Sequence, residues 1–166
     1  MHRRGHVGTA LAAYAPIGGL LVAVGGDALA AAGGAVAVGL ATLPDVDRRI
    51  PFVDHRGVTH TVHFAVAVGV FLGGAGALSG RSAGIGTAIA FGGFGFLVGS
   101  TTILSHVAAD ALTPMGVDPL RTGRRCSLDV ARAANPIAND ALLALGAVAV
   151  GVAYVVGAAI AGSMPG

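Results

Sequence analysis

The chain has 166 residues, of which 54% are hydrophobic and only 11% charged, and its mean hydropathy is +0.79. A soluble domain carries roughly 25% charged residues, so this composition excludes an ordinary soluble globule, a disordered chain and a nucleic-acid-binding tail. The net charge is +2; all ten basic residues are Arg and all eight acidic residues are Asp. The single Cys126 excludes an intramolecular disulfide.

Five apolar stretches are long enough to suggest membrane spans, since a bilayer core about 30 Å thick needs ~20 apolar helical residues. They cover residues 7–26, 28–44, 61–80, 82–105 and 141–162. The second stretch is short and follows a tight turn at Asp27, so a hairpin of two shorter helices is the alternative there. The sequence predicts an all-α, multi-pass transmembrane helical bundle that forms a single integral-membrane domain over 1–166, with a loop over 106–139.

The arginines predict the orientation of these spans, because basic residues collect on the cytoplasmic side of a membrane. With the N-terminus inside, Arg81 is the one arginine outside, and the other nine are cytoplasmic. A secretory signal ending at Ala28-Leu29-Ala30 is the alternative for the first span, but its removal would invert this distribution. We therefore expect a multi-pass protein of the cell membrane with a cytoplasmic N-terminus.

Histidines and aspartates gather at the predicted cytoplasmic span ends, where such residues are costly and often functional. His6 precedes the first span, and the turn Pro44-Asp45-Val46-Asp47 follows the second. Alone, His6 reads as an interfacial histidine and the Asp pair as a solvated turn. The stretch from Asp54 to His63 leads into the third span and holds three His and an Arg.

The fourth cluster lies at the end of the fourth span, where His106 and Asp110 are four residues apart. This spacing puts an imidazole and a carboxylate on one helical face, for a metal or for a buried hydrogen-bonded pair. Because neighbouring helices lie 8–10 Å apart, four span ends can share one site. The predicted metal ligands of that site are His6, Asp45, Asp47, His60, His106 and Asp110. Such ligands fit one or two divalent metals, with zinc or manganese preferred.

The same residues carry a resemblance to the family of LexA-regulated, predicted membrane-bound metal-dependent hydrolases. The family pattern has a His before the first span, a Pro-Asp-x-Asp turn, a His-Arg-Gly-x-Thr-His-Ser stretch and a Ser-His-x-x-x-Asp-x-x-Thr-x-x-Gly stretch. This chain matches it from His6 to Gly116, with Thr61 in place of the usual Ser and Arg48 where many members have a His. Asp140 is a loose match to an acidic residue ahead of the last span. The resemblance implies a small inner-membrane hydrolase.

The expected function is therefore hydrolysis by a metal-activated water at the cytoplasmic membrane edge, acting on a phosphoester or acyl bond. The lipid bilayer is the expected surrounding and a lipid or phosphoester the expected substrate, with no nucleic acid. In this scheme Arg56 holds an anionic group and His55 is a general acid or base. Thr59 is a third predicted catalytic residue, and it can also cap the helix that begins at His60. A metal-binding or transport protein without catalysis and a structural membrane protein are the alternatives.

Overall fold

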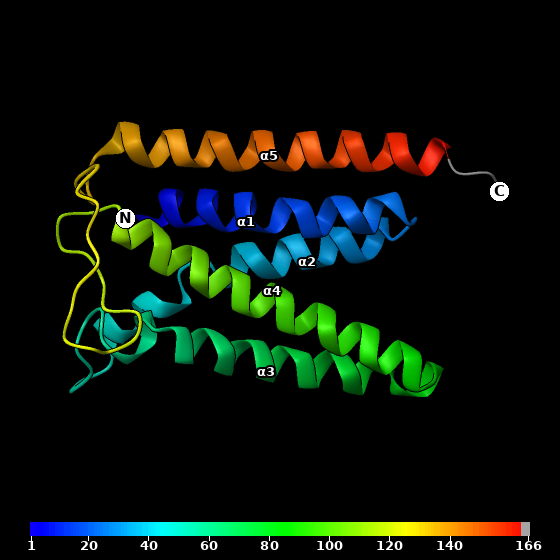
Figure 1. Cartoon of the computed structure of the whole chain (residues 1–166), viewed down its shortest axis with the longest axis horizontal. Helices are drawn as coiled ribbons and strands as arrows, with labels where there is room; N and C mark the ends of the chain where they lie inside the picture. The colour runs from blue at the N-terminus through cyan, green and yellow to red at the C-terminus, as the bar shows by residue number, and fades with distance from the viewer. Residues whose placement is uncertain (164–166) are drawn as a thin grey trace.

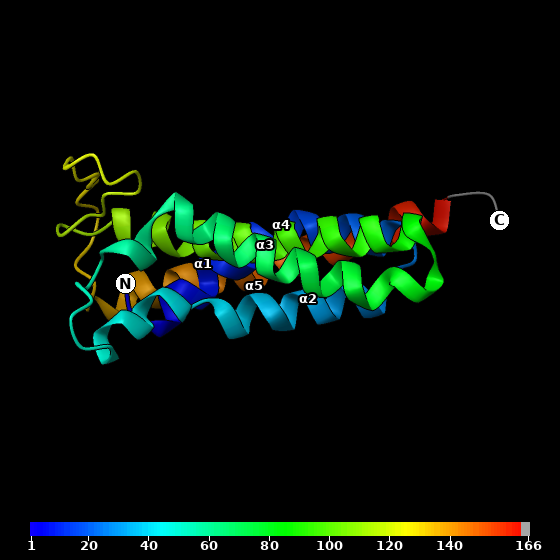
Figure 2. The ribbon, with the colours of Figure 1, turned by 90° about the horizontal axis from the view of Figure 1, so that it is seen from below.

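The structure, a computed structural model, describes residues 1–163, whose regular secondary structure is helical apart from one isolated bridge between Val117 and Cys126. The long helices are α1 (Arg3–Ala23), α2 (Asp27–Leu40), α3 (Val62–Gly80), α4 (Ile85–Ala111) and α5 (Pro136–Ser163). Short 3₁₀ helices are η1 (Leu43–Arg49), η2 (Val58–His60) and η3 (Arg81–Ala83). The long helices run along one axis, and the longest connections gather at one end of the bundle (Figures 1 and 2).

Within residues 1–163, five segments are long and apolar enough to cross a membrane, which confirms the predicted all-α, multi-pass architecture. The bounds of individual helices differ from the prediction. The fourth span was expected to end at residue 105, but α4 continues to Ala111, so His106 and Asp110 lie on a helix rather than in the predicted loop. The last span was expected to begin at residue 141, whereas α5 begins at Pro136. That loop is accordingly shorter than predicted.

The second predicted span consists of two pieces. α2 has 14 residues and therefore a length of about 21 Å, which is less than the ~30 Å of a bilayer core. The chain continues through η1, and the two together form a candidate span of 23 residues. Backbone that is not α-helical is tolerated at membrane depth only where protein or a cavity surrounds it. The break after α2 thus brings the Asp45 turn inward, against the other helices.

The helices pack as two close pairs, α1 with α5 and α3 with α4, joined by contacts of α1 with α2 and α4. Figure 1 shows α5 and α3 at opposite edges of the bundle. Glycine allows the close approach within each pair. A Cβ atom on Gly146 of α5 would overlap the backbone carbonyl of Gly8 in α1, and one on Gly95 of α4 would overlap the carbonyl of Leu72 in α3.

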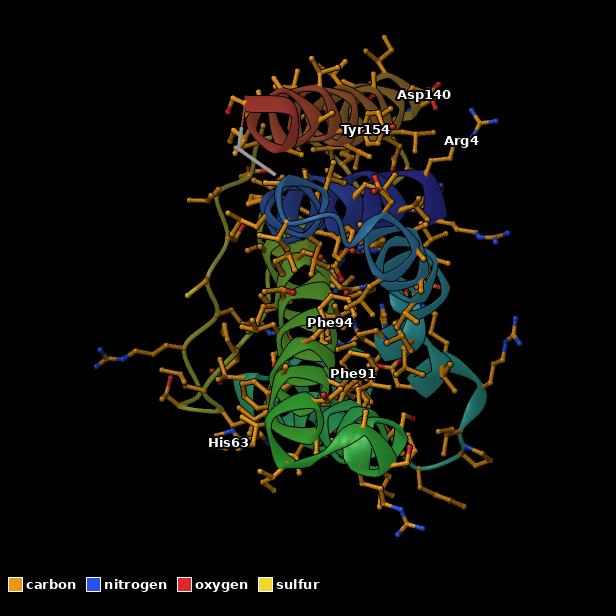
Figure 3. All side chains as sticks on the ribbon, turned by 90° about the vertical axis from the view of Figure 1, so that its right-hand side faces the viewer. Arg4, His63, Phe91, Phe94, Asp140 and Tyr154 are labelled. Carbon is orange, nitrogen blue, oxygen red and sulfur yellow. The ribbon has the colours of Figure 1, made fainter. Side chains whose placement is uncertain are left out.

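Large apolar side chains cover the outer faces of the bundle. Examples are Leu20 on α1, Phe71 on α3 and Val155 on α5, which are 71%, 75% and 65% exposed. Apolar side chains also radiate outward in the view along the axis (Figure 3). A soluble monomer rarely exposes so much apolar surface, whereas lipid covers it in a membrane. The outer faces therefore fit a bilayer environment.

Nine of the ten arginines lie at one end of the bundle, which we call the arginine-rich end: there α1, α3 and α5 begin and α2 and α4 end. Residues 127–134, between α4 and α5, form no helix. This loop instead folds over the end of α4: Leu128 donates to the carbonyl of Ala111, and Val130 and Ala131 donate to that of Leu112. Backbone carbonyls at a helix end need such donors.

Candidate metal centre

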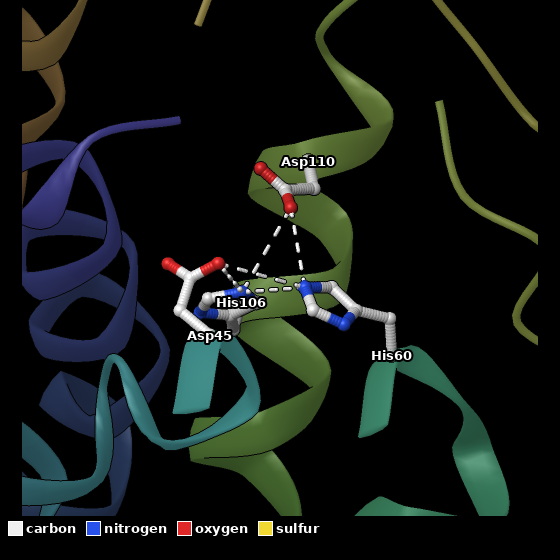
Figure 4. A group of neighbouring side chains, drawn as sticks. All are labelled: Asp45, His60, His106 and Asp110. Atoms are coloured by element: carbon white, nitrogen blue, oxygen red, sulfur yellow. Dashed lines mark hydrogen bonds and ion pairs between the residues drawn. The ribbon is translucent and has the colours of Figure 1, made fainter. Parts of the chain in front are cut away.

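Four side chains from three segments meet at the arginine-rich end. Asp45 comes from η1, His60 from η2, and His106 and Asp110 from the last turns of α4 (Figure 4). One nitrogen or oxygen from each lies within 4.8 Å of the other three, so the group could hold a metal ion. His60, His106 and Asp110 are at most 1% exposed and Asp45 is 21% exposed. We refer to these residues as the four-donor cluster.

Each of the two histidine rings is oriented by its Nδ1 atom. Nδ1 of His106 lies 2.8 Å from the carbonyl oxygen of Ala41, which follows α2. Nδ1 of His60 lies 3.0 Å from the hydroxyl of Thr59 and 3.3 Å from a carboxylate oxygen of Asp47. A carbonyl or carboxylate oxygen can only accept, so this network assigns the ring proton to Nδ1 in both residues. Both Nε2 atoms then carry lone pairs, the form in which imidazole binds metals.

These two lone-pair nitrogens face each other. Nε2 of His60 and Nε2 of His106 lie 3.1 Å apart, and Asp110 Oδ2 lies 3.5 and 3.8 Å from them. Asp45 Oδ1 lies 3.9 and 4.0 Å from the same two atoms. Ligands about 2.0–2.1 Å from a zinc ion in a tetrahedron are about 3.3 Å apart. The spacing is thus that of a slightly open tetrahedral site.

Two buried carboxylate oxygens of the cluster lack hydrogen-bond partners among residues 1–163. They are Oδ1 of Asp45 and Oδ2 of Asp110, the atoms nearest to the two imidazoles. A buried polar atom without a partner is costly, and two such oxygens beside two lone-pair nitrogens repel one another. A cation between them removes this cost, so the donor set fits a divalent metal ion.

Asp47 was predicted as a ligand, but it lies beside the four-donor cluster and is not one of its donors. Its Oδ2 accepts from the hydroxyl of Thr59 at 2.9 Å and from the backbone amide of Arg56 at 3.1 Å, and its Oδ1 lies 3.0 Å from Nδ1 of His55. Both oxygens therefore have donors. The arrangement of Asp47 behind His60 is a carboxylate–histidine pair of the kind that orients metal ligands. Asp47, His55 and His60 also form a second, more open group of donors.

His55 and Thr59, predicted as catalytic residues, both contact Asp47, the carboxylate behind the predicted ligand His60. Nε2 of His55 accepts from Arg48 at 2.9 Å while its Nδ1 faces Asp47, so both ring nitrogens are engaged. Thr59 donates to Asp47 and lies beside His60. The expected cap role of Thr59 belongs to Thr61, whose hydroxyl accepts from the amide of Phe64 at 3.1 Å and begins α3. The extended backbone at Thr61 leaves its side chain free to cap the helix.

Arg56, predicted to hold a substrate anion, is instead buried against Asp110. One guanidinium nitrogen lies 3.0 Å from Asp110 Oδ1, and another donates to Thr113 and to the carbonyl of Gly116, each at 2.9 Å. Burial lowers the pKa of the Arg56 guanidinium below its usual value, an effect that the charge of Asp110 opposes. Its two terminal nitrogens thus already have partners, and the contact with Asp110 holds that carboxylate in place. Anion binding by Arg56 stays a prediction.

His6 lies next to the cluster but outside the four donors. Its ring stacks on that of His106, with 3.6 Å between ring centroids and 8° between planes. Its Nε2 lies 2.9 Å from the backbone oxygen of Met1, 3.5 Å from Asp110 Oδ1 and 3.8 Å from Asp45 Oδ2. The backbone amine of Met1 also pairs with Asp110 Oδ1. The structure thus brings His6 to the centre as a neighbour that holds the carboxylates.

Other residues singled out in the sequence lie elsewhere. His63 is exposed on the outside of α3 (Figure 3), although it follows His60 by only three residues. Asp140 pairs with Arg4 at 2.9 Å on the surface (Figure 3), so it does not join the cluster. Sequence reasoning missed the carbonyl of Ala41, because no side-chain pattern marks a carbonyl that receives a distant imidazole proton. Asn135 caps α5 by accepting from the amide of Ala138 at 3.1 Å.

Comparison with known proteins identifies the family. A family model described as the YdjM inner membrane protein matches residues 1–164. The chain therefore belongs to the YdjM inner membrane protein family, which agrees with its five candidate spans. No curated protein and no solved structure was found to be similar to it. The description gives the membrane location and no activity.

Proposed function

We propose that this chain is a membrane-bound metal-dependent hydrolase whose divalent ion, zinc or manganese, is held by the four-donor cluster. The observation that carries the proposal is the 3.1 Å approach of two imidazole Nε2 atoms, beside two buried carboxylate oxygens that accept no hydrogen bond within residues 1–163. The partners of both Nδ1 atoms assign the ring protons to the opposite side of each ring. Two imidazoles and two carboxylates are ligands that suit either metal. The resemblance of the four sequence motifs to predicted metal-dependent hydrolases supports the same function.

A divalent ion at such a centre polarises a water molecule and so supplies a nucleophile for hydrolysis of a phosphoester or acyl bond. The chain's own residues prepare the ligands for it. Ala41 and Asp47 keep the protons of His106 and His60 on Nδ1, away from the cluster. Arg56 and Thr113 hold the Asp110 end of α4 in place. The site is therefore organised by the protein before a metal or a substrate arrives.

The proposed location is the cytoplasmic edge of the cell membrane. Nine arginines at the arginine-rich end against Arg81 at the other favour that end as the inside, by the tendency of basic residues to stay cytoplasmic. The cluster lies in the last turns of α4, close to where a bilayer ends. A lipid or a lipid-linked substrate is within reach of such a site.

The test is elemental analysis of detergent-purified protein, followed by hydrolysis assays on phosphoester and acyl-ester panels with added Zn²⁺ or Mn²⁺. We expect bound metal and metal-dependent hydrolysis in wild type and in His63→Ala, whose side chain is exposed outside the cluster. His106→Ala should lose both. Absence of metal from wild type overturns the proposal, and so does bound metal without hydrolysis of any compound in the panels.

The second of those outcomes leaves a metal-binding protein without catalysis. Transport is less well supported, because a pathway across the membrane needs polar or charged groups near the middle of the spans. Within residues 1–163, the charged side chains of the five long helices lie in their first or last two turns. Hydrolysis at the membrane edge therefore agrees better with where the chain places its charges.

A further inference from the structure

One of the four donor residues is partly exposed, although its donor oxygen Asp45 Oδ1 is itself buried. Asp45 is 21% exposed, whereas the other three donors are at most 1% exposed. Asp45 also lines a cavity of about 320 Å³ together with Arg3, Thr42, Val46, Arg48 and Arg49. The cavity thus lies between the start of α1 and η1 and borders the side chain of Asp45.

The cavity carries more positive than negative charge, with three guanidinium groups and one carboxylate. Arg48 is already engaged, since its Nε lies 3.5 Å from Asp45 Oδ1 and its terminal nitrogen donates to His55. Arg3 and Arg49 are exposed, and neither side chain forms a hydrogen bond or ion pair with any residue of 1–163. Two guanidinium groups without hydrogen bonds or ion pairs among residues 1–163 therefore line this cavity beside Asp45.

Resting on the proposed function, we propose that this cavity admits the substrate and that Arg3 and Arg49 bind a phosphate group on it. A guanidinium fork matches the oxygens of phosphate and stays charged at all physiological pH values. Phosphate carries more charge than a single carboxylate, which suits two free arginines better. The substrate then carries a phosphate group, which a simple acyl ester lacks.

A second, larger cavity of about 580 Å³ provides the comparison. It is lined by Arg56, Arg121 and Arg125 among other residues, but by none of the four donors. Arg121 and Arg125 are exposed, as Arg3 and Arg49 are. Removing two charges from either cavity changes the net charge of the protein equally, so the pair Arg121 and Arg125 is a matched control.

The experiment measures binding of inorganic phosphate to the full chain in detergent by calorimetry. The variants are the double substitutions Arg3→Gln with Arg49→Gln, and Arg121→Gln with Arg125→Gln. We expect the first pair to weaken binding by at least about tenfold, the size of a lost charge-assisted hydrogen bond, and the second pair to leave it unchanged. Equal loss in both pairs, or no phosphate binding by wild type, overturns the proposal.

Two further measurements distinguish a soluble phosphate compound from a lipid, and failure of the phosphate site from failure of the proposed hydrolase. Glycerol phosphate in solution and phosphatidic acid in nanodiscs share the group, and whichever depends on Arg3 and Arg49 identifies a soluble or a lipid substrate. If phosphate binding depends on Arg3 and Arg49 but no compound is hydrolysed, the phosphate site is supported and the proposed hydrolase function is wrong. If only acyl esters are hydrolysed, and the Arg3 and Arg49 substitutions do not affect their hydrolysis, the hydrolase function is supported and the phosphate site is wrong.

Discussion

The Nε2 atoms of His60 and His106 face each other at 3.1 Å, although oxygen acceptors at both Nδ1 atoms assign the ring protons to those opposite nitrogens. These residues are 46 positions apart in the chain and come from η2 and α4. Two lone pairs at that distance repel unless a cation lies between them. The relationship therefore leads directly to a test of metal content.

Replacing either histidine should remove the metal. We expect His60→Ala and His106→Ala to purify with little zinc or manganese, because each change removes one of four donors. His63→Ala should retain the wild-type content, since that side chain is exposed on α3. Elemental analysis of the three variants and wild type provides the measurement. Wild-type metal content in both cluster variants would place the ion elsewhere.

Asp47 should tune the affinity for metal without supplying a ligand. Asp47→Asn removes the charge behind His60 but keeps a polar group of the same shape, so we expect metal to bind about 10–100-fold more weakly. Competition with a chelator of known affinity measures the change. Thr59→Ser, which keeps the hydroxyl that donates to Asp47, should remain near wild type. A complete loss of metal in Asp47→Asn would make Asp47 a direct ligand.

Arg56 should matter for stability as well as for the centre. It is 6% exposed and its guanidinium lies 3.0 Å from the buried Asp110. Removing one partner of such a pair costs about 3–5 kcal/mol, because the remaining charge stays buried. We expect Arg56→Gln to lower the thermal midpoint in detergent clearly, and Arg56→Lys to restore it only partly, since Lys lacks the fork that reaches Thr113 and Gly116. Arg132→Gln, at an exposed position, is the control and should show no shift.

The contact between α1 and α5 depends on glycine. Gly146→Val would force side-chain atoms into the backbone of Gly8, so we expect a loss of about 1–3 kcal/mol or separation of the two helices. Gly151→Val lies on the same helix, where an added Cβ meets no atom within 4 Å. Thermal unfolding of the two variants in detergent should therefore differ, and equal midpoints would show that α1 and α5 are not closely packed.

The orientation is testable with the native cysteine. Cys126 is exposed at the arginine-rich end, so a membrane-impermeant maleimide should label it only after cells are permeabilised. The control carries Cys126→Ser and Ser82→Cys, which moves the thiol to the exposed turn between α3 and α4. That variant should be labelled in intact cells. The reverse pattern would place the centre outside the cytoplasm.

The sequence alone determined the membrane class, the five apolar segments and the small set of polar residues at one end. The reason is that a bilayer imposes a length and a composition on every span, and scarce His and Asp then stand out against Ala, Val and Gly. The i, i+4 spacing of His106 and Asp110 is local, so it too was readable, and both lie on α4 and contribute to the four-donor cluster.

The tertiary structure alone decided which polar residue does what. Asp45 and Asp47 differ by two positions, yet the 3₁₀ turn of η1 turns one toward the imidazoles and the other toward His55, Arg56 and Thr59. Arg56 lies in a positive-φ turn that carries its guanidinium to Asp110, a residue 54 positions later. These roles depend on contacts between distant segments, and the packing of α4 against η1 and η2 is what creates them.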